Sequence, residues 1–217
     1  MAEETKTAPP AATLVLLVRH GQTPTTGKVL PGRAPGLHLA DKGTEQAEKV
    51  AKRLAELPVT AIYTSPLERT QETAVPTSAL LGIEPVVEEG LLECDFGDWT
   101  GVDLAELNKL PEWSTVQRAP STFRFPNGES FTEMQTRICS AIDRVRARHD
   151  QGVVVCFSHA DPIKAAVAQA MGTHLDLFQR IVVSPCSVSA IAYAPGNAPI
   201  VLTVNSTGEP LAELRPS

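Results

Sequence analysis

Short apolar runs alternate with helical patterns along most of this chain, and this alternation constrains its fold more than any other feature. Six segments have the composition of strands: residues 14–18, 59–64, 85–88, 153–157, 187–193 and 199–204. The spacing of apolar residues and the stop signals predict helices over residues 44–57, 67–81, 104–109, 130–149 and 162–171. Such an order is typical of a three-layer α/β/α sandwich with a mostly parallel central sheet.

The length of the chain favours a single domain. With 217 residues, 42% of them hydrophobic, it can bury a substantial core. Residues 13–205 are expected to form that domain, with residues 90–128 as an insertion over one end of the sheet. Residues 1–12 combine acidic residues with paired prolines and contain no apolar h-region, so we expect a disordered tail and a cytoplasmic location. Residues 206–217 are expected to form a C-terminal tail.

The overall charge limits the classes of partner. A net charge of −6 and a pI near 5.4 argue against a general nucleic-acid or membrane-surface binder, while a basic pocket for an anionic substrate remains compatible. The apolar runs are too short to span a bilayer.

The four cysteines form no zinc or disulfide pattern; Cys94 is expected to pack in the interior, with a reactive thiol as the alternative. The edge segment 191–204 leaves a homodimer open.

Ionisable side chains follow four of the predicted strands, at the points where those strands end: Arg19 and His20, Arg69, Glu93, and His159. Ligands bind at the carboxyl ends of strands in open α/β sheets. Arginine presents a planar fork of donors that suits phosphate oxygens, and a neutral histidine can act as a nucleophile. Two arginines, two histidines and one glutamate at one edge of a sheet therefore indicate phosphoryl transfer.

The motifs around these side chains resemble those of the histidine phosphatase superfamily, in its phosphoglycerate mutase-like branch. Five motifs occur in the family's order: residues 19–23 (RHGQT), 65–70 (SPLERT), 92–101 (LECDFGDWTG), 127–130 (NGES) and 158–159 (SH). The resemblance covers nearly all of residues 14–193. It implies a phosphoglycerate mutase-like fold.

The resemblance also implies a mechanism, namely hydrolysis of a small phosphorylated metabolite through a phosphohistidine. His20 would attack the phosphomonoester, and Arg19, Arg69 and His159 would clamp the phosphoryl oxygens. Glu93 would protonate the leaving oxygen and then help to activate water. No metal ion or other cofactor is expected, because the arginines supply the positive charge. Three neighbouring acids compete with Glu93 for its role: Glu89, Asp95 and Asp98.

Several residues near the motifs have two interpretations. Thr26 stands where many relatives have Asn, and we expect its hydroxyl to bind phosphate. Thr23 either binds phosphate or stabilises the loop turn, and Gly21 is expected to let the backbone approach a ligand. Asp161 is interpreted as a helix N-cap before Pro162, with contact to a polar or cationic part of the substrate as the alternative.

Three functions compete at this point. The complete set of site residues argues against a non-catalytic protein that binds a phosphorylated ligand. Glycolytic mutases of the superfamily usually carry a longer and more basic insertion, so the short segment 102–125 favours a phosphatase over a mutase.

The identity of the substrate stays open. Four cations either contact a second anionic group on it or are solvated surface charges, which is the commoner fate of a loop cation: Lys28, Arg33, Arg118 and Arg124. Glu129 is expected to order the start of the helix that follows it.

Overall fold

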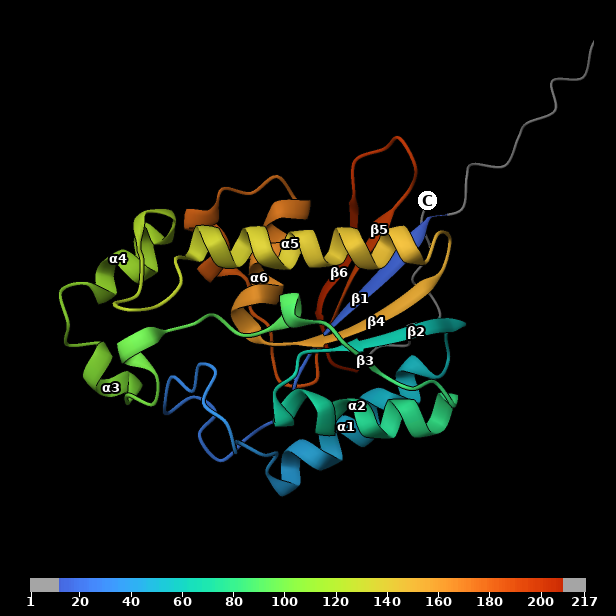
Figure 1. The fold of residues 1–217 in the computed structure, drawn as a ribbon, viewed down its shortest axis with the longest axis horizontal. Coiled ribbons are helices and arrows are strands. Elements are labelled where there is room, and N and C mark those ends of the chain that lie inside the picture. Colours follow the sequence, from blue (N-terminus) through green and yellow to red (C-terminus); the bar gives the residue numbers. More distant parts are fainter. Residues whose placement is uncertain (1–11, 209–217) are drawn as a thin grey trace, which may run out of the picture.

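A single six-stranded sheet forms the centre of the protein (Figure 1). The computed structural model describes residues 12–208, so residues 1–11 and 209–217, which include most of both expected tails, lie outside the described residues. The strands are β1 (Thr13–Arg19), β2 (Val59–Thr64), β3 (Val86–Val87), β4 (Val153–Ser158), β5 (Val188–Tyr193) and β6 (Ile200–Ser206). Their order is β3-β2-β4-β1-β5-β6, and only β5 runs against its neighbours. The predicted mostly parallel sheet is confirmed.

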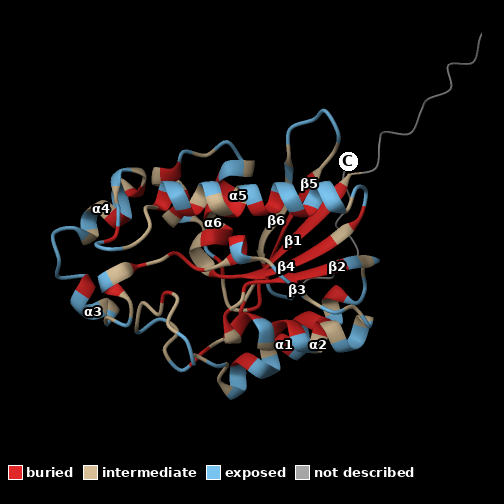
Figure 2. Ribbon diagram, in the orientation of Figure 1, coloured by how far each residue is buried: buried red, intermediate tan, exposed pale blue. Residues whose placement is uncertain are grey.

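Helices cover both faces of this sheet. The helices α1 (Asp41–Leu54) and α2 (Glu68–Leu81) lie on one face, and α5 (Phe131–Arg148) and α6 (Ala160–Ala170) lie on the other (Figure 1). Side chains of β1 alternate between the two resulting cores, with Val15 and Leu17 in one and Leu16 and Val18 in the other. Figure 2 shows the buried sheet between half-buried helices. Among residues 12–208, no helix has the length and apolarity needed to cross a membrane.

The segment 90–128 is more regular than expected. Besides the predicted short helix, now α3 (Leu104–Leu107), it contains α4 (Trp113–Arg118) and three 3-10 helices, η1 (Glu89–Leu91), η2 (Gly97–Trp99) and η3 (Pro120–Thr122). Aromatic rings anchor it to α5, because the Phe125 ring centroid lies 5.2 Å from that of Phe131 and 5.4 Å from that of Trp99. These rings tie the segment to a helix that covers the sheet.

The starts of α5 and α6 are set in different ways. The helix α5 begins at Phe131 because Ser130 forms a capping box: its Oγ accepts from the Glu133 amide, and the Glu133 carboxylate accepts from the Ser130 amide. In contrast, α6 begins at Ala160, two residues before the predicted start, with His159 at its N-cap position. Asp161 therefore lies inside the first turn, and its interpretation as the N-cap is wrong.

The loop after β1 is held against α1 by two glycines. A Cβ on Gly21 would lie 2.5 Å from the Gly43 carbonyl oxygen, and a Cβ on Gly43 would lie 2.1 Å from the Gln22 carbonyl oxygen. The amide of Gly21 donates to Thr73 Oγ1 on α2 at 3.0 Å. Position 21 therefore needs a glycine because the backbone of Gly43 lies against it. The sequence analysis had expected the close contact to be with a ligand.

We predict that Gly43→Ala destabilises the protein by about 1–3 kcal/mol, as overpacking of a core does. Helix propensity alone would give the opposite sign, since alanine is favoured over glycine inside a helix. Urea unfolding measures the difference. Gly208→Ala is the matched control, because no atom of residues 12–206 lies within 4 Å of a Cβ built there. A stabilised Gly43→Ala protein would show that the loop and α1 can separate without cost.

Candidate active site

Three neighbouring strands bring the predicted side chains together. Arg19 ends β1, His20 follows it, and His159 follows β4. Arg69 is the second residue of α2, which begins four residues after β2 ends. The main chain continues the sheet register beyond β1, because the His20 amide donates to the Ser158 carbonyl at 3.0 Å. As a result, the ring centroids of His20 and His159 lie 5.3 Å apart.

The His20 ring is fixed in one tautomer. Its Nδ1 lies 2.7 Å from the Gly21 carbonyl oxygen, which can only accept, so Nδ1 carries the proton. The side chain is 4% exposed, and burial together with the charges of Arg69 and Arg19 holds the pKa of His20 well below its ordinary value. The neutral ring therefore keeps a lone pair on Nε2, the form in which a histidine is nucleophilic.

The two arginines have buried nitrogens without partners. Arg19 donates one bond to the Val183 carbonyl at 2.8 Å, and Arg69 donates one to the Gly32 carbonyl at 2.8 Å. Within residues 12–208, Nε of Arg19 and both Nε and Nη1 of Arg69 are buried and make no hydrogen bond. Buried donors rarely stay unpaired in native proteins. A set of cationic donors in this state is suited to bind an anion.

His159 adds a further donor. Its Nε2 lies 2.9 Å from Ser65 Oγ, and its buried Nδ1 has no partner in the described part of the chain. Burial and the nearby charge of Arg69 hold the pKa of His159 well below its ordinary value. The ring is consequently neutral at pH 7 and joins the arginines around His20.

Glu93 is a buried carboxyl group beside this cationic cluster. It is 6% exposed, and one oxygen accepts a hydrogen bond from the Cys94 amide at 2.9 Å. Burial, with help from the charge of Asp161, raises the pKa of Glu93 to about 7, against the opposing effects of that amide, Arg69 and Arg19. Near neutral pH this group exchanges a proton readily, as a general acid or base must.

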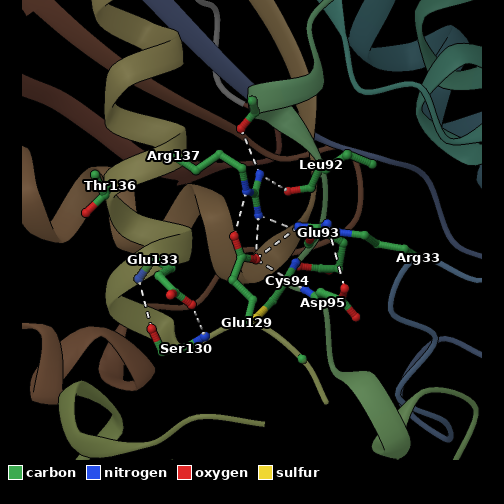
Figure 3. Close-up of polar contacts among 12 residues, drawn as sticks. Arg33, Leu92, Glu93, Cys94, Asp95, Glu129, Ser130, Glu133, Thr136 and Arg137 are labelled. Carbon is green, nitrogen blue, oxygen red and sulfur yellow. Dashed lines mark hydrogen bonds and ion pairs between the residues drawn. The ribbon is translucent and has the colours of Figure 1, made fainter. Parts of the chain in front are cut away.

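An ionic hub holds the backbone at Glu93 (Figure 3). The Glu129 carboxylate accepts from Arg33 at 3.0 Å and from Arg137 at 2.8 and 2.9 Å. Both arginines also donate to the Glu93 carbonyl, and Arg137 reaches two more carbonyls of segment 90–92. Glu129 was expected to order the start of α5, but Ser130 and Glu133 do so. Glu129 instead links α5 to the loop that carries Glu93.

A cavity of about 370 Å³ opens beside the cluster. Arg19, His20, Glu93, Thr23 and Thr26 are among the residues that line it. Thr26 Oγ1 accepts the Thr23 amide proton at 2.8 Å, and the two hydroxyl oxygens lie 3.0 Å apart. These bonds stabilise the loop turn, which was one of the two interpretations of Thr23. Both threonines also border the space beside His20.

The cations proposed to reach the substrate lie elsewhere. Arg33 belongs to the hub, Arg124 pairs with Glu133, and Lys28 and Arg118 are exposed; none of the four lines the cavity. Two further polar residues line the cavity and were not predicted from the sequence, namely Lys164 on α6 and Gln179 on η4 (Leu175–Arg180). The signal for Lys164 was available, since it lies five residues after His159, on the helix that begins there.

Asp161 lines the same cavity and pairs with Lys164 at 3.0 Å. Asp161 therefore borders the same space as His20, and its alternative interpretation, contact with the substrate, stays a prediction. Cys94 is fully buried, and burial raises the pKa of its thiol well above the ordinary value. The alternative of a reactive Cys94 thiol is wrong.

Comparison with known proteins places this site in a family. The sequence profile described as the histidine phosphatase superfamily (branch 1) matches residues 15–206. The bifunctional protein Rv2228c of Mycobacterium tuberculosis is 32% identical over 200 residues, which cover 90% of this chain and 54% of that protein, so the chain spans about half the length of this relative. Phosphoserine phosphatase 1 of Hydrogenobacter thermophilus is 30% identical over 89% of this chain and 92% of its own.

A solved structure agrees with the fold described above. The Bacillus stearothermophilus protein YhfR superposes with a TM-score of 0.83 and 28% identity, covering 91% of this chain and 98% of its own. The expected phosphoglycerate mutase-like fold is confirmed.

The raised pKa of Glu93 predicts a stability that falls as pH rises. Below about pH 4.5 the carboxyl is protonated in both the folded and the unfolded chain, and above about pH 7 the folded protein must bury its charge. We expect Glu93→Gln to gain stability relative to the wild type, from nothing near pH 4 to about 3 kcal/mol above pH 7. Urea unfolding across this range measures the gain. A difference that is constant with pH would contradict the buried, titrating carboxyl.

Proposed function

This chain belongs to the histidine phosphatase superfamily (branch 1), and from that premise we propose that it hydrolyses a small phosphorylated metabolite through a phosphohistidine. The observation that carries the proposal is the nucleophilic Nε2 of His20 beside buried donors that lack partners in the described chain. A phosphoryl group is an anion that satisfies such donors while its phosphorus meets a nucleophile.

In the first step, Nε2 of His20 attacks phosphorus and the bond to the ester oxygen breaks. Arg19, Arg69 and His159 stabilise the charge that spreads over the phosphoryl oxygens. Glu93 gives its proton to the leaving oxygen, so that an alcohol departs. A carboxyl with a pKa of about 7 is protonated in a large fraction of the molecules at neutral pH, which suits this role.

In the second step, the Glu93 carboxylate takes a proton from a water molecule as that water attacks phosphorus. The P–N bond breaks, His20 regains its lone pair and inorganic phosphate leaves. The volume of the cavity supports this step, since about 370 Å³ leaves room for water once the alcohol has departed. A mutase would need to keep water from the phosphoenzyme. The proposal of a phosphatase rests on this difference.

The printed names of relatives support the substrate class. One relative is named a phosphoserine phosphatase, and a solved structure with the same fold, at 22% identity and a TM-score of 0.79, is a mycobacterial glucosyl-3-phosphoglycerate phosphatase. Both names describe small phosphorylated metabolites. The residues that this chain supplies for the chemistry need no metal ion in the steps above, because the arginines carry the positive charge.

The proposal is tested by measuring phosphate release without added metal from p-nitrophenyl phosphate, sugar phosphates, phosphoglycerates and nucleotides. We expect activity in the wild type and a loss to background in His20→Ala. His174→Ala is the matched control, because its side chain is exposed and lies outside the cavity. A stable phosphoryl label on His20 without phosphate release would indicate a mutase. Neither label nor release would leave only a binding protein.

The role of Glu93 predicts a dependence on the leaving group. For an alkyl phosphate, Glu93→Gln should lower kcat by roughly 10²–10⁴-fold, the usual contribution of a general acid. For p-nitrophenyl phosphate the loss in the first step should be much smaller, because nitrophenolate departs without a proton. Single-turnover kinetics isolate this step. An equal loss with both esters would assign Glu93 a role other than acid.

A further inference from the structure

The wall of the cavity contains a group of polar side chains that the proposed mechanism does not use. Lys164 Nζ lies 3.0 Å from Asp161 Oδ1 and 3.0 Å from Gln179 Oε1. The side chains of Lys164 and Asp161 are only 16% and 17% exposed, and all three residues line the cavity together with Arg19 and His20. The Phe178 ring lies behind them, with its centroid 5.9 Å from Nζ. We call Asp161, Lys164 and Gln179 the polar wall.

The polar wall offers both donors and an acceptor to a ligand. An ammonium has three N–H groups, and two of those on Lys164 are used by Asp161 and Gln179. The amide NH₂ of Gln179 makes no hydrogen bond to residues 12–208, and Asp161 Oδ2 accepts none from them. A hydroxyl group both accepts and donates, so it matches this set. A carboxylate only accepts and would leave Asp161 facing a like charge.

The charge of Asp161 reaches the reacting groups. After burial, it is the main cause of the raised pKa of Glu93, so a further anion beside it would add to an existing unfavourable field. A cationic group on the substrate would meet Lys164 instead. The ion pair is neutral as a whole, and a neutral polar group is therefore the occupant that neither member repels.

We propose that the polar wall binds the alcohol portion of the substrate and selects phosphomonoesters with an uncharged, hydroxyl-bearing alcohol over those with a carboxylate. This inference rests on the proposed function and specifies its substrate class. Asp161 supplies the selection against anions, while Lys164 and Gln179 donate to the hydroxyl oxygen.

Two esters isolate this selection. Glycerol 3-phosphate and 3-phosphoglycerate have similar alkoxide leaving groups and differ in a hydroxymethyl group replaced by a carboxylate. The measurement is the ratio of their kcat/KM values at one pH, so that effects on His20 or on the pKa of Glu93 act on both esters and cancel. We expect the wild type to favour glycerol 3-phosphate.

Variants with opposite charge changes should move this ratio in opposite directions. Asp161→Asn removes the repulsion and should shift the ratio toward 3-phosphoglycerate by about tenfold, the scale of a like-charge contact in a partly solvated site. Lys164→Gln removes the cation and should shift it further toward glycerol 3-phosphate. Because the two predictions differ in sign, a general loss of activity or partial unfolding of one variant does not mimic the pattern.

The controls come from a pair with the same spacing outside the cavity. Glu106 and Lys109 form an exposed i,i+3 ion pair, as Asp161 and Lys164 form a partly buried one. Glu106→Gln and Lys109→Gln should leave the ratio unchanged. A wild type that favours 3-phosphoglycerate, or an Asp161→Asn ratio equal to that of the wild type, would overturn the inference.

Failure of the inference is distinguishable from failure of the proposed function. If p-nitrophenyl phosphate is hydrolysed in a His20-dependent reaction but neither ester is a substrate, the proposed phosphatase function is supported and the proposed selection by the polar wall is contradicted. If no ester is hydrolysed through His20, both fall together.

Discussion

Positive charge buried at the ends of adjacent strands is the constraint on which the rest of the site depends. Arg19 and Arg69 are held out of water, where an unpaired charge is costly. One nitrogen of each arginine donates to a main-chain carbonyl, of Val183 or of Gly32, which fixes the guanidinium groups, while other donors have no partner among residues 12–208. Burial and the same charges keep His20 neutral. A single electrostatic arrangement thus prepares both the anion site and the nucleophile.

The parts of the site that sequence predicted are those that local patterns determine. An apolar run followed by Arg19 and His20, or by His159, identifies a strand end, and parallel neighbours bring such ends together. Glu93 was placed by its motif, and the structure gives it burial, a raised pKa and a place in the cavity wall, whereas none of its three competitors lines the cavity. Most of the site residues were therefore predicted from where the strands end.

The parts that sequence did not predict depend on contacts between distant segments. Arg33 looked like a free loop cation because its partner Glu129 lies 96 residues away in the chain. Lys164 and Gln179 meet only when η4 packs beside α6, and the position of Asp161 follows from where α6 begins. Long-range pairs of this kind are decided by tertiary packing, which a single sequence does not display.

The hub at Glu129 has a consequence for how the protein opens. Bonds to the Glu129 carboxylate and to the Glu93 carbonyl join the loop with Arg33, the segment that carries Glu93 and the helix with Arg137, so each of them can move away only by breaking its bonds to the other two. Segments coupled in this manner open as one cooperative unit. A thermal fluctuation would then either displace Glu93 together with the segments bonded to it or leave all of them in place. Few molecules would have Glu93 displaced while the surrounding segments stay native.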